Sequence, residues 1–130
     1  MIDARLVDKV KSAINALHPS AQLKKIDVYG ASDNELLEIN NKHLQHNYYT
    51  DIITFDYSRG NRISGELHIS VERVKDNASA LGLAYESELL RVIAHGILHL
   101  IGFKDKTKEE EAVMRSKEDE VLAYLEKYGS

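Results

Sequence analysis

The longest apolar stretch of the chain runs from Ser87 to Asp105, SELLRVIAHGILHLIGFKD. If this segment is helical, apolar side chains point in nearly every direction, so the helix must be largely buried. The polar exceptions Ser87, Arg91, His95 and His99 recur every four residues, and four helical steps of about 100° return to within about 40° of the starting direction. The pattern therefore predicts a buried central helix with a single polar stripe.

Hydrophobic periodicity elsewhere predicts four more helices and three strands. Helical spacing covers residues 3–17, 32–44, 71–81 and 107–125, and Ser32 with Glu35 forms a capping box for the second of these. Alternating or β-branched patterns mark strands at residues 23–29, 51–57 and 65–71. We expect an α+β fold in one domain spanning residues 1–130, with a small mixed sheet of three to four strands and about five helices around the buried central helix.

The polar stripe and the residues after it have the composition of a metal site. His95 and His99 lie one helical turn apart, close enough for their rings to bind one small cation. Gly102 can take the left-handed conformation that ends a helix, which would let Asp105 reach back towards the imidazoles. Three protein ligands leave a fourth tetrahedral position for water or substrate, the pattern of a catalytic zinc.

The alternative is that the two histidines are merely hydrogen-bonded, which is the commoner fate of an HxxxH pair in a helix. Here the surroundings disfavour it, because an unsatisfied buried polar group costs about 1 to 3 kcal/mol. A single metal ion would satisfy both rings at once. The pattern therefore favours a metal ion held by His95, His99 and Asp105.

Composition narrows the classes of function. The chain has 130 residues, no cysteine and a formal net charge of -4, so thiolate metal sites and thiol nucleophiles are excluded. Net acidity argues against coating nucleic acid by bulk electrostatics, but it allows a nuclease with a local basic cleft. No apolar run approaches a membrane span, and Met1 leads into a charged amphipathic segment rather than a signal peptide. We expect a cytoplasmic protein with no membrane association.

The segment HGILHLIGFKD resembles the motif HGxLHLxGxDH of the YbeY family of bacterial metal-dependent endoribonucleases. Residues 40–55, which end in TDIITF, are similar to the family's N…TDVLSF block, and Gly65-Glu66-Leu67 is similar to the start of its next strand. Met114 and Glu118 fall where the family often has a methionine and an acid. The likeness covers residues 39–125 in four ordered blocks.

The resemblance implies a single-strand-specific, metal-dependent endoribonuclease acting in 16S ribosomal RNA maturation and ribosome quality control. It implies RNA and the ribosome or its small subunit as partners, and one zinc ion per chain. Nickel is possible as well, because both metals accept imidazole ligands. The oligomeric state stays open.

Three departures from the family pattern affect these expectations. Asp105 stands where the family usually has a third histidine, and its negative charge should leave the metal a weaker Lewis acid. Leu44 occupies the position of a family arginine thought to handle RNA. The chain also starts in a helix rather than a strand, so the sheet should be one strand short.

Roles beyond the metal ligands are assigned with alternatives. Glu66 opens the alternating strand at the family's acidic position, and we expect it with His95 in catalysis, although it could equally be an ordinary outward-facing carboxylate. Arg91 could bind an RNA phosphate through bidentate hydrogen bonds and assist catalysis, or it could pair with a nearby acid. Asp51, with Thr50, is expected to shape the cleft that binds the substrate by hydrogen bonding at the strand entry. The alternative is that both only cap the turn, which is the favoured interpretation for Thr50.

Two rival functions remain at this point. A zincin-like metalloprotease shares the HxxxH arrangement, but zincins place a glutamate directly after the first histidine, and this chain has Gly96 there. A non-catalytic, ribosome-associated binding module with a structural metal gains some weight from Leu44 and from the net acidity.

Overall fold

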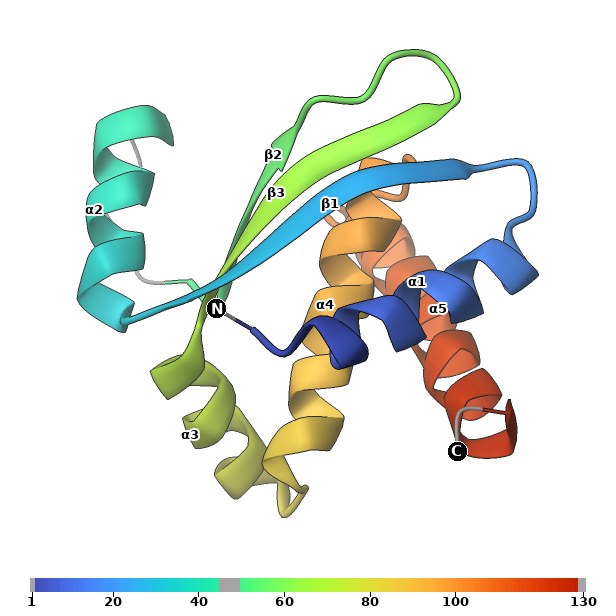
Figure 1. Cartoon of the computed structure of the whole chain (residues 1–130). Coiled ribbons are helices and arrows are strands. Elements are labelled where there is room, and N and C mark those ends of the chain that lie inside the picture. The colour runs from blue at the N-terminus through green and yellow to red at the C-terminus, as the bar shows by residue number, and fades with distance from the viewer. Residues whose placement is uncertain (1, 45–49, 129–130) are drawn as a thin grey trace.

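The computed structural model describes residues 2–44 and 50–128, with the side chains of residues 43 and 44 outside the described part. In these ranges the element order is α1 (Ala4–Leu17), β1 (Gln22–Ala31), α2 (Asp33–Leu44), β2 (Ile52–Asp56), β3 (Arg62–Ser70), α3 (Val71–Leu81), α4 (Tyr85–Leu100) and α5 (Lys108–Tyr128) (Figure 1). The predicted α+β class is confirmed, and the first described element is a helix, as expected. Leu44, the residue at the family's arginine position, ends α2, and its side chain lies outside the described residues.

The sheet is mixed and has three strands in the part of the chain that the structure describes. The strand order is β1-β3-β2, with β3 in the middle. β1 runs parallel to β3, and β2 runs antiparallel to it. Strand β3 buries every second residue, so one face of the sheet is apolar, as the alternating sequence predicts.

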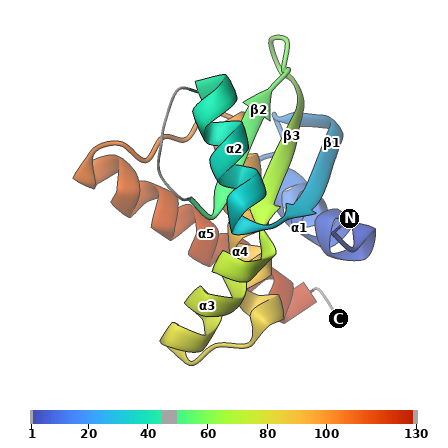
Figure 2. The same ribbon diagram turned by 90° about the vertical axis from the view of Figure 1, so that its left-hand side faces the viewer.

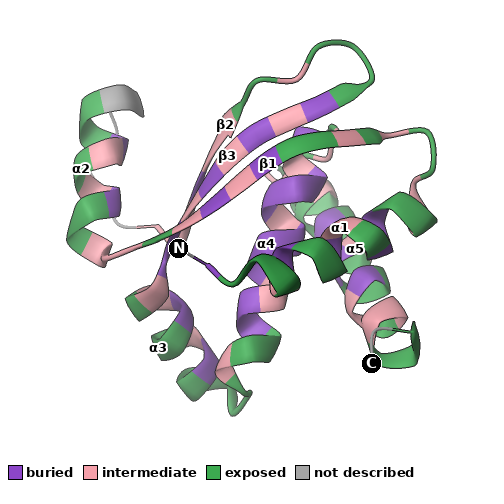
Figure 3. Ribbon diagram, viewed as in Figure 1, coloured by how far each residue is buried: buried purple, intermediate pink, exposed green. Residues whose placement is uncertain are grey.

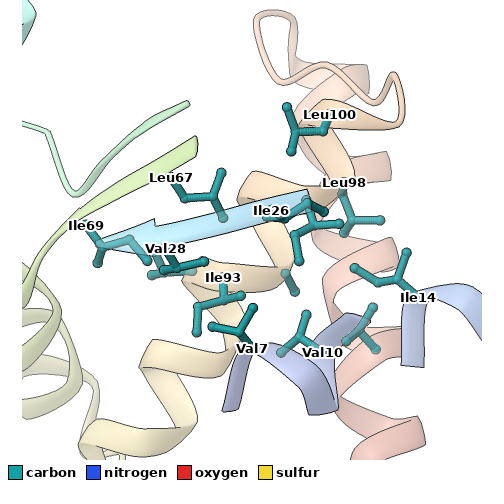
Figure 4. Close-up of a cluster of buried hydrophobic side chains, with 14 of the residues drawn as sticks. Val7, Val10, Ile14, Ile26, Val28, Leu67, Ile69, Ile93, Leu98 and Leu100 are labelled. Carbon is teal, nitrogen blue, oxygen red and sulfur yellow. The ribbon is translucent and has the colours of Figure 1, made fainter. Parts of the chain in front are cut away.

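Helices α1, α4 and α5 lie on one side of the sheet and α2 lies on the other (Figures 1 and 2). Burial follows the same division, because the buried stripes of the helices and strands face one another (Figure 3). The core between them joins Val10 of α1 and Ile93 of α4 to Val28 and Leu67 of the sheet (Figure 4). The predicted central helix is therefore the element around which the core is built.

Local signals in the sequence set where the helices begin. The Ser32 backbone N–H donates to the Glu35 carboxylate, and the Glu35 N–H donates to the Ser32 hydroxyl, which is the predicted capping box. Thr107 and Glu110 make the same reciprocal pair in front of α5. Asp3 caps α1 by accepting from the Arg5 N–H.

Gly96 lets α4 approach the sheet closely. A Cβ atom placed on Gly96 would lie 2.8 Å from both terminal methyl groups of Leu67 and 2.8 Å from the Ile52 Cδ1 atom. Only a residue without a side chain fits at this crossing. The helix is therefore held against β2 and β3, with its two histidines at the end nearest the loop that follows it.

Among the described residues, no helix combines the length and the apolar composition that crossing a membrane requires.

Candidate metal centre

His95 and His99 lie in the last turns of α4 and face the same side. Their ring centroids are 4.6 Å apart and the ring planes are nearly perpendicular, at 82°. About a quarter of each side chain is exposed, 23% for His95 and 28% for His99. The two imidazoles thus line an accessible site instead of filling the core.

The chain reverses direction immediately after α4. The Phe103 N–H donates to the Leu98 carbonyl and the Gly102 N–H donates to the His99 carbonyl, the two hydrogen bonds of a Schellman motif. Gly102 has a φ of 118°, a left-handed value that disfavours residues with a side chain. This turn carries Asp105 back over the end of the helix, as the sequence predicts.

Asp105 meets both imidazoles at one point. Its Oδ2 atom lies 3.2 Å from the Nε2 atom of His95 and 3.2 Å from the Nε2 atom of His99. Ligands that bind zinc tetrahedrally at about 2.0 to 2.1 Å lie about 3.3 Å from one another. The donor atoms of the three residues all lie within 4.8 Å of one another, so the spacing and the donor chemistry fit a small divalent ion.

The other nitrogen of each imidazole is held by an acceptor. His95 Nδ1 lies 2.7 Å from a carboxylate oxygen of Glu118, and His99 Nδ1 lies 2.9 Å from the Phe103 carbonyl oxygen. A carbonyl accepts only, and the Glu118 carboxyl is favoured in its ionised, accepting form, so both Nδ1 atoms carry the hydrogen and donate it. In its neutral form each ring therefore keeps its lone pair on Nε2, on the side of Asp105, and this tautomer is the one that a metal ligand needs.

Burial and hydrogen bonding oppose each other in the pair formed by His95 and Glu118. Burial raises the pKa of the Glu118 carboxyl, whereas hydrogen bonds from His95 and Arg91 lower it. The lowering effects together are larger, so the pKa lies below its usual value. Burial lowers the pKa of His95, whereas the hydrogen bond and charge of Glu118, followed by the charges of Asp105 and Asp51, raise it above its usual value. Glu118 therefore stays ionised beside the imidazole.

Arg91 is bound to helix α5. Its guanidinium lies 3.0 Å from a Glu118 carboxylate oxygen and 2.7 Å from a carboxylate oxygen of Asp119. The sequence left open whether Arg91 binds phosphate or pairs with a nearby acid. In the structure it pairs with two acids of α5. The arginine holds Glu118 in place and so supports His95 indirectly.

Two cavities flank the three ligand residues. We call the first, of about 400 Å³, the α5-side cavity, and the second, of about 620 Å³, the β2-side cavity. Both are lined by His95, Asp105 and Asp51, so Asp51 lies where the sequence predicts, at the cleft. Thr50 also lines the β2-side cavity, together with Asp56 and Lys106 among others. The candidate metal centre thus lies where two open spaces meet.

Glu66 lies on the far side of the sheet from α4. Its neighbours Gly65 and Leu67 on β3 face Leu100 and Gly96 of that helix, so Glu66 points the opposite way. The Tyr57 hydroxyl donates to Glu66 over 2.9 Å, and the His68 Nε2 atom lies 3.5 Å from its carboxylate. Glu66 lines neither of the cavities described above. Because the sheet separates it from the histidines, we leave Glu66 out of the proposed catalytic group.

The sequence interpretation missed the contact between Glu118 and His95. Glu118 was noted only as part of the family likeness, yet its residue is just 5% exposed. The sequence did contain a signal for this contact. Glu118 has the spacing of a buried helical stripe with Met114 and Val121, which are both apolar. An acid on such a stripe requires a buried partner.

Taken together, the fold and the site define a small α+β protein with a candidate metal centre of the hydrolytic type. The chain belongs to the Endoribonuclease YbeY family, whose model matches residues 2–126.

Relatives and one solved structure agree with this membership. A Bacteroides thetaiotaomicron protein is 50% identical over 102 residues, which cover 78% of this chain and 74% of that protein. A Bacteroides fragilis protein is 54% identical over 92 residues, covering 71% of this chain and 66% of that protein. Both are named Endoribonuclease YbeY. The solution structure of a Thermotoga maritima protein matches with a TM-score of 0.62 at 25% identity, covering 98% of this chain and 88% of that one.

Proposed function

We propose that the protein is a metal-dependent endoribonuclease that cuts single-stranded RNA. The observation that carries this proposal is the meeting of two imidazole Nε2 atoms with the Asp105 carboxylate, at 3.2 Å each. The name of the relatives, Endoribonuclease YbeY, supplies the substrate class. Within that class we infer a role in 16S ribosomal RNA maturation and ribosome quality control in the cytoplasm, with the small ribosomal subunit as a partner.

His95, His99 and Asp105 would hold one zinc or nickel ion. Bound there, the ion would lower the pKa of a coordinated water and stabilise charge that develops on the phosphate. Glu118 and the Phe103 carbonyl orient the two rings by accepting from their Nδ1–H groups. Because the donors are fixed before the ion arrives, little reorganisation is needed on binding.

Positive charge for the RNA backbone comes from side chains around the two cavities. Lys106 lines the β2-side cavity, and Arg115, with 62% of its side chain exposed, lines the α5-side cavity. Arg91 contributes charge from the wall, although Glu118 and Asp119 neutralise part of it. Acids outnumber these cations around both cavities, so a bound metal ion would have to supply most of the positive potential that meets an RNA phosphate.

Asp51 is the remaining acid that borders both cavities. Its backbone carbonyl accepts from the Ser70 N–H, which fixes the chain just before β2. We infer that Asp51 shapes the path between the two cavities and contacts the RNA there. Its position next to His95 suits a group that orients an attacking hydroxyl by accepting a hydrogen bond.

The metalloprotease alternative is disfavoured by the position of Gly96. In a zincin, the residue directly after the first histidine supplies the general base. Here that residue is directed at Leu67 of the sheet, where a Cβ atom would already lie 2.8 Å from two methyl groups. A glutamate at position 96 would therefore have no room.

Metal content tests the ligand set directly. We expect about one metal ion per chain in the protein as isolated, and a sharp loss in Asp105→Ala, measured by elemental analysis. Asp27→Ala is the matched control, because Asp27 pairs in register with Glu66 on the far face of the sheet. Equal metal content in both variants would remove Asp105 from the ligand set.

Cleavage assays test the reaction. We expect the protein to cut single-stranded RNA, chelator to stop the cutting, and casein to stay intact. Casein loss without RNA loss would favour the protease. If the protein holds metal and binds ribosomes while His95→Ala leaves RNA processing in cells unchanged, the non-catalytic binding module is the better description.

A further inference from the structure

Glu88 is a buried acid that the proposed mechanism does not use. It lies in the first turn of α4 and is only 7% exposed. Its Oε1 atom is buried and, among the described residues, has no hydrogen-bond partner. Such an arrangement lowers stability, so it calls for a functional explanation or a further partner.

Glu88 lines the same cavity as the candidate metal centre. The α5-side cavity is lined by Glu88, Asp51, His95 and Asp105, among others. Glu88 and His95 are seven helical steps apart. Their side chains therefore leave the helix axis within about 20° of the same direction, and they lie about 10 Å apart along the axis. A ligand that reaches from His95 to Glu88 must extend beyond a single reacting phosphate, as a neighbouring nucleotide of RNA does.

The charges around Glu88 come from three elements. Arg91 lies on α4 itself, Asp51 precedes β2, and Arg115 and Glu118 belong to α5. Burial raises the pKa of Glu88, and the charges of Asp51 and Glu118 act in the same direction, against Arg91 and Arg115. Glu88 therefore holds its proton to a higher pH than an exposed glutamate does.

A neutral carboxyl group explains both the burial and the position. The buried Oε1 atom can remain as a carbonyl oxygen, because lacking a partner costs less for a neutral carbonyl than for a charged carboxylate. The other can then donate a hydrogen bond into the cavity. Two guanidinium groups, those of Arg91 and Arg115, line the same cavity together with the acids Asp51, Asp105, Glu111 and Glu118. An ionised Glu88 would add to this negative charge and repel a phosphate, whereas a neutral carboxyl can donate a hydrogen bond to one of its oxygens.

We propose that Glu88 is a second RNA contact of this site, whose protonated carboxyl donates a hydrogen bond to a phosphate oxygen next to the phosphate that is cut. The inference rests on the proposed function for the identity of the ligand. It assigns the α5-side cavity to the substrate and gives the first turn of α4 a binding role.

The test compares RNA binding by the wild type, Glu88→Gln and Glu88→Ala from the ordinary glutamate pKa of 4.5 upwards, over the pH range in which the protein stays folded. The probe is a short single-stranded oligoribonucleotide with phosphorothioate linkages that slow cleavage, bound to the full chain as isolated. A glutamine amide donates at every pH. We therefore expect wild-type affinity to fall with rising pH, Glu88→Gln to bind about tenfold more tightly than the wild type at the alkaline end, and Glu88→Ala to bind about tenfold more weakly than Glu88→Gln throughout.

Glu86→Gln is the matched control, because Glu86 lies in the same first turn and is exposed. It should follow the wild-type curve. The proposal is overturned if Glu88→Gln keeps the wild-type pH dependence, or if it binds no better than Glu88→Ala while both remain folded by circular dichroism.

Cleavage of an unmodified RNA in parallel separates this inference from the proposed function. RNA binding with the expected pH signature but without cutting would refute the endoribonuclease and leave the Glu88 contact standing. Cutting without that signature would refute only the role of Glu88.

Discussion

Removing the Glu118 carboxylate tests how the candidate metal centre is held together. The Glu118 side chain is 6% exposed, and its Oε2 atom lies 2.7 Å from the Nδ1 atom of His95. Loss of an acceptor that orients a metal-binding histidine typically lowers metal affinity by about 10- to 100-fold. For Glu118→Ala we expect zinc affinity to fall within that range, which corresponds to about 1.4 to 2.7 kcal/mol.

The same substitution should affect the fold less than it affects the metal. Arg91 loses its contact with Glu118 at 3.0 Å but keeps the one with Asp119 at 2.7 Å, so no guanidinium is left buried without a partner. His95, by contrast, loses the side-chain acceptor for its Nδ1–H group and becomes free to rotate or change tautomer. The metal ligand, rather than the arginine, therefore bears the main cost.

Competition with a chromophoric chelator measures the zinc affinity of each variant. Glu118→Gln should fall between the wild type and Glu118→Ala, because an amide oxygen accepts but carries no charge. Asp119→Ala is the control: Asp119 also contacts Arg91 but is 60% exposed and makes no contact with His95 that the structure records. It should stay within about twofold of the wild type. Wild-type affinity in Glu118→Ala, or an equal loss in Asp119→Ala, would refute the orienting role.

Three further predictions follow from other parts of the structure. Gly96→Ala should lower the free energy of unfolding by about 1 to 3 kcal/mol, because the new methyl group would overlap Leu67; urea denaturation measures this. Glu88→Gln should be more stable than the wild type at neutral pH and should lose that advantage below the ordinary glutamate pKa, in urea titrations across pH. Asp105→His should move the rising limb of the pH–rate profile to lower pH, because a neutral third ligand leaves the metal-bound water more acidic.

The sign of the Glu88 prediction follows from linkage. Burial raises the pKa of folded Glu88 above the unfolded value of about 4.5, so the protonated form favours folding. That stability is fully present below the unfolded pKa and is lost as the pH rises through the folded pKa. Glutamine mimics the protonated form at all pH values, so parallel pH curves for Glu88→Gln and the wild type would contradict the prediction.

Gly96→Ala and Asp105→His each have an outcome that would contradict the reasoning. Adding Leu67→Ala to Gly96→Ala should recover part of the lost stability, because the double substitution removes the overlap, and purely additive effects would count against a packing cause. For Asp105→His, a rising limb that stays in place or moves to higher pH would show that ligand charge does not control the acidity of the metal-bound water.

The convergence of His95, His99 and Asp105 could be predicted from sequence because all of its determinants are local. His95, His99, Gly102 and Asp105 fall within eleven consecutive residues. Helical geometry fixes the first two, and a Schellman turn around Gly102 fixes the path to Asp105. The confirmed capping box of Ser32 and Glu35 has the same origin, since it depends on residues three positions apart.

Glu66 illustrates what a local pattern leaves undetermined. Strand alternation in β3 separates apolar from polar positions, but taken alone it does not say on which of the two faces α4 packs. The structure decides this through Gly96, which brings α4 against Leu67 on the apolar face. Once α4 is recognised as almost wholly apolar, its place on the apolar face follows, and a polar residue of the same strand such as Glu66 must point away from the histidines.

The charge around the candidate site ties Asp105, Glu118 and Arg91 together. Three neutral imidazoles would leave a divalent ion with its full charge of about +2, whereas Asp105 reduces the charge of the ligand group to about +1. Glu118 would lower it further, but Arg91 lies 3.0 Å from that carboxylate and offsets its charge. Pairing Arg91 with Glu118, instead of leaving it free for phosphate, thus limits how far this carboxylate would reduce the charge of a bound metal ion. The polar stripe of α4 therefore contains Arg91 as a partner for the acids of α5.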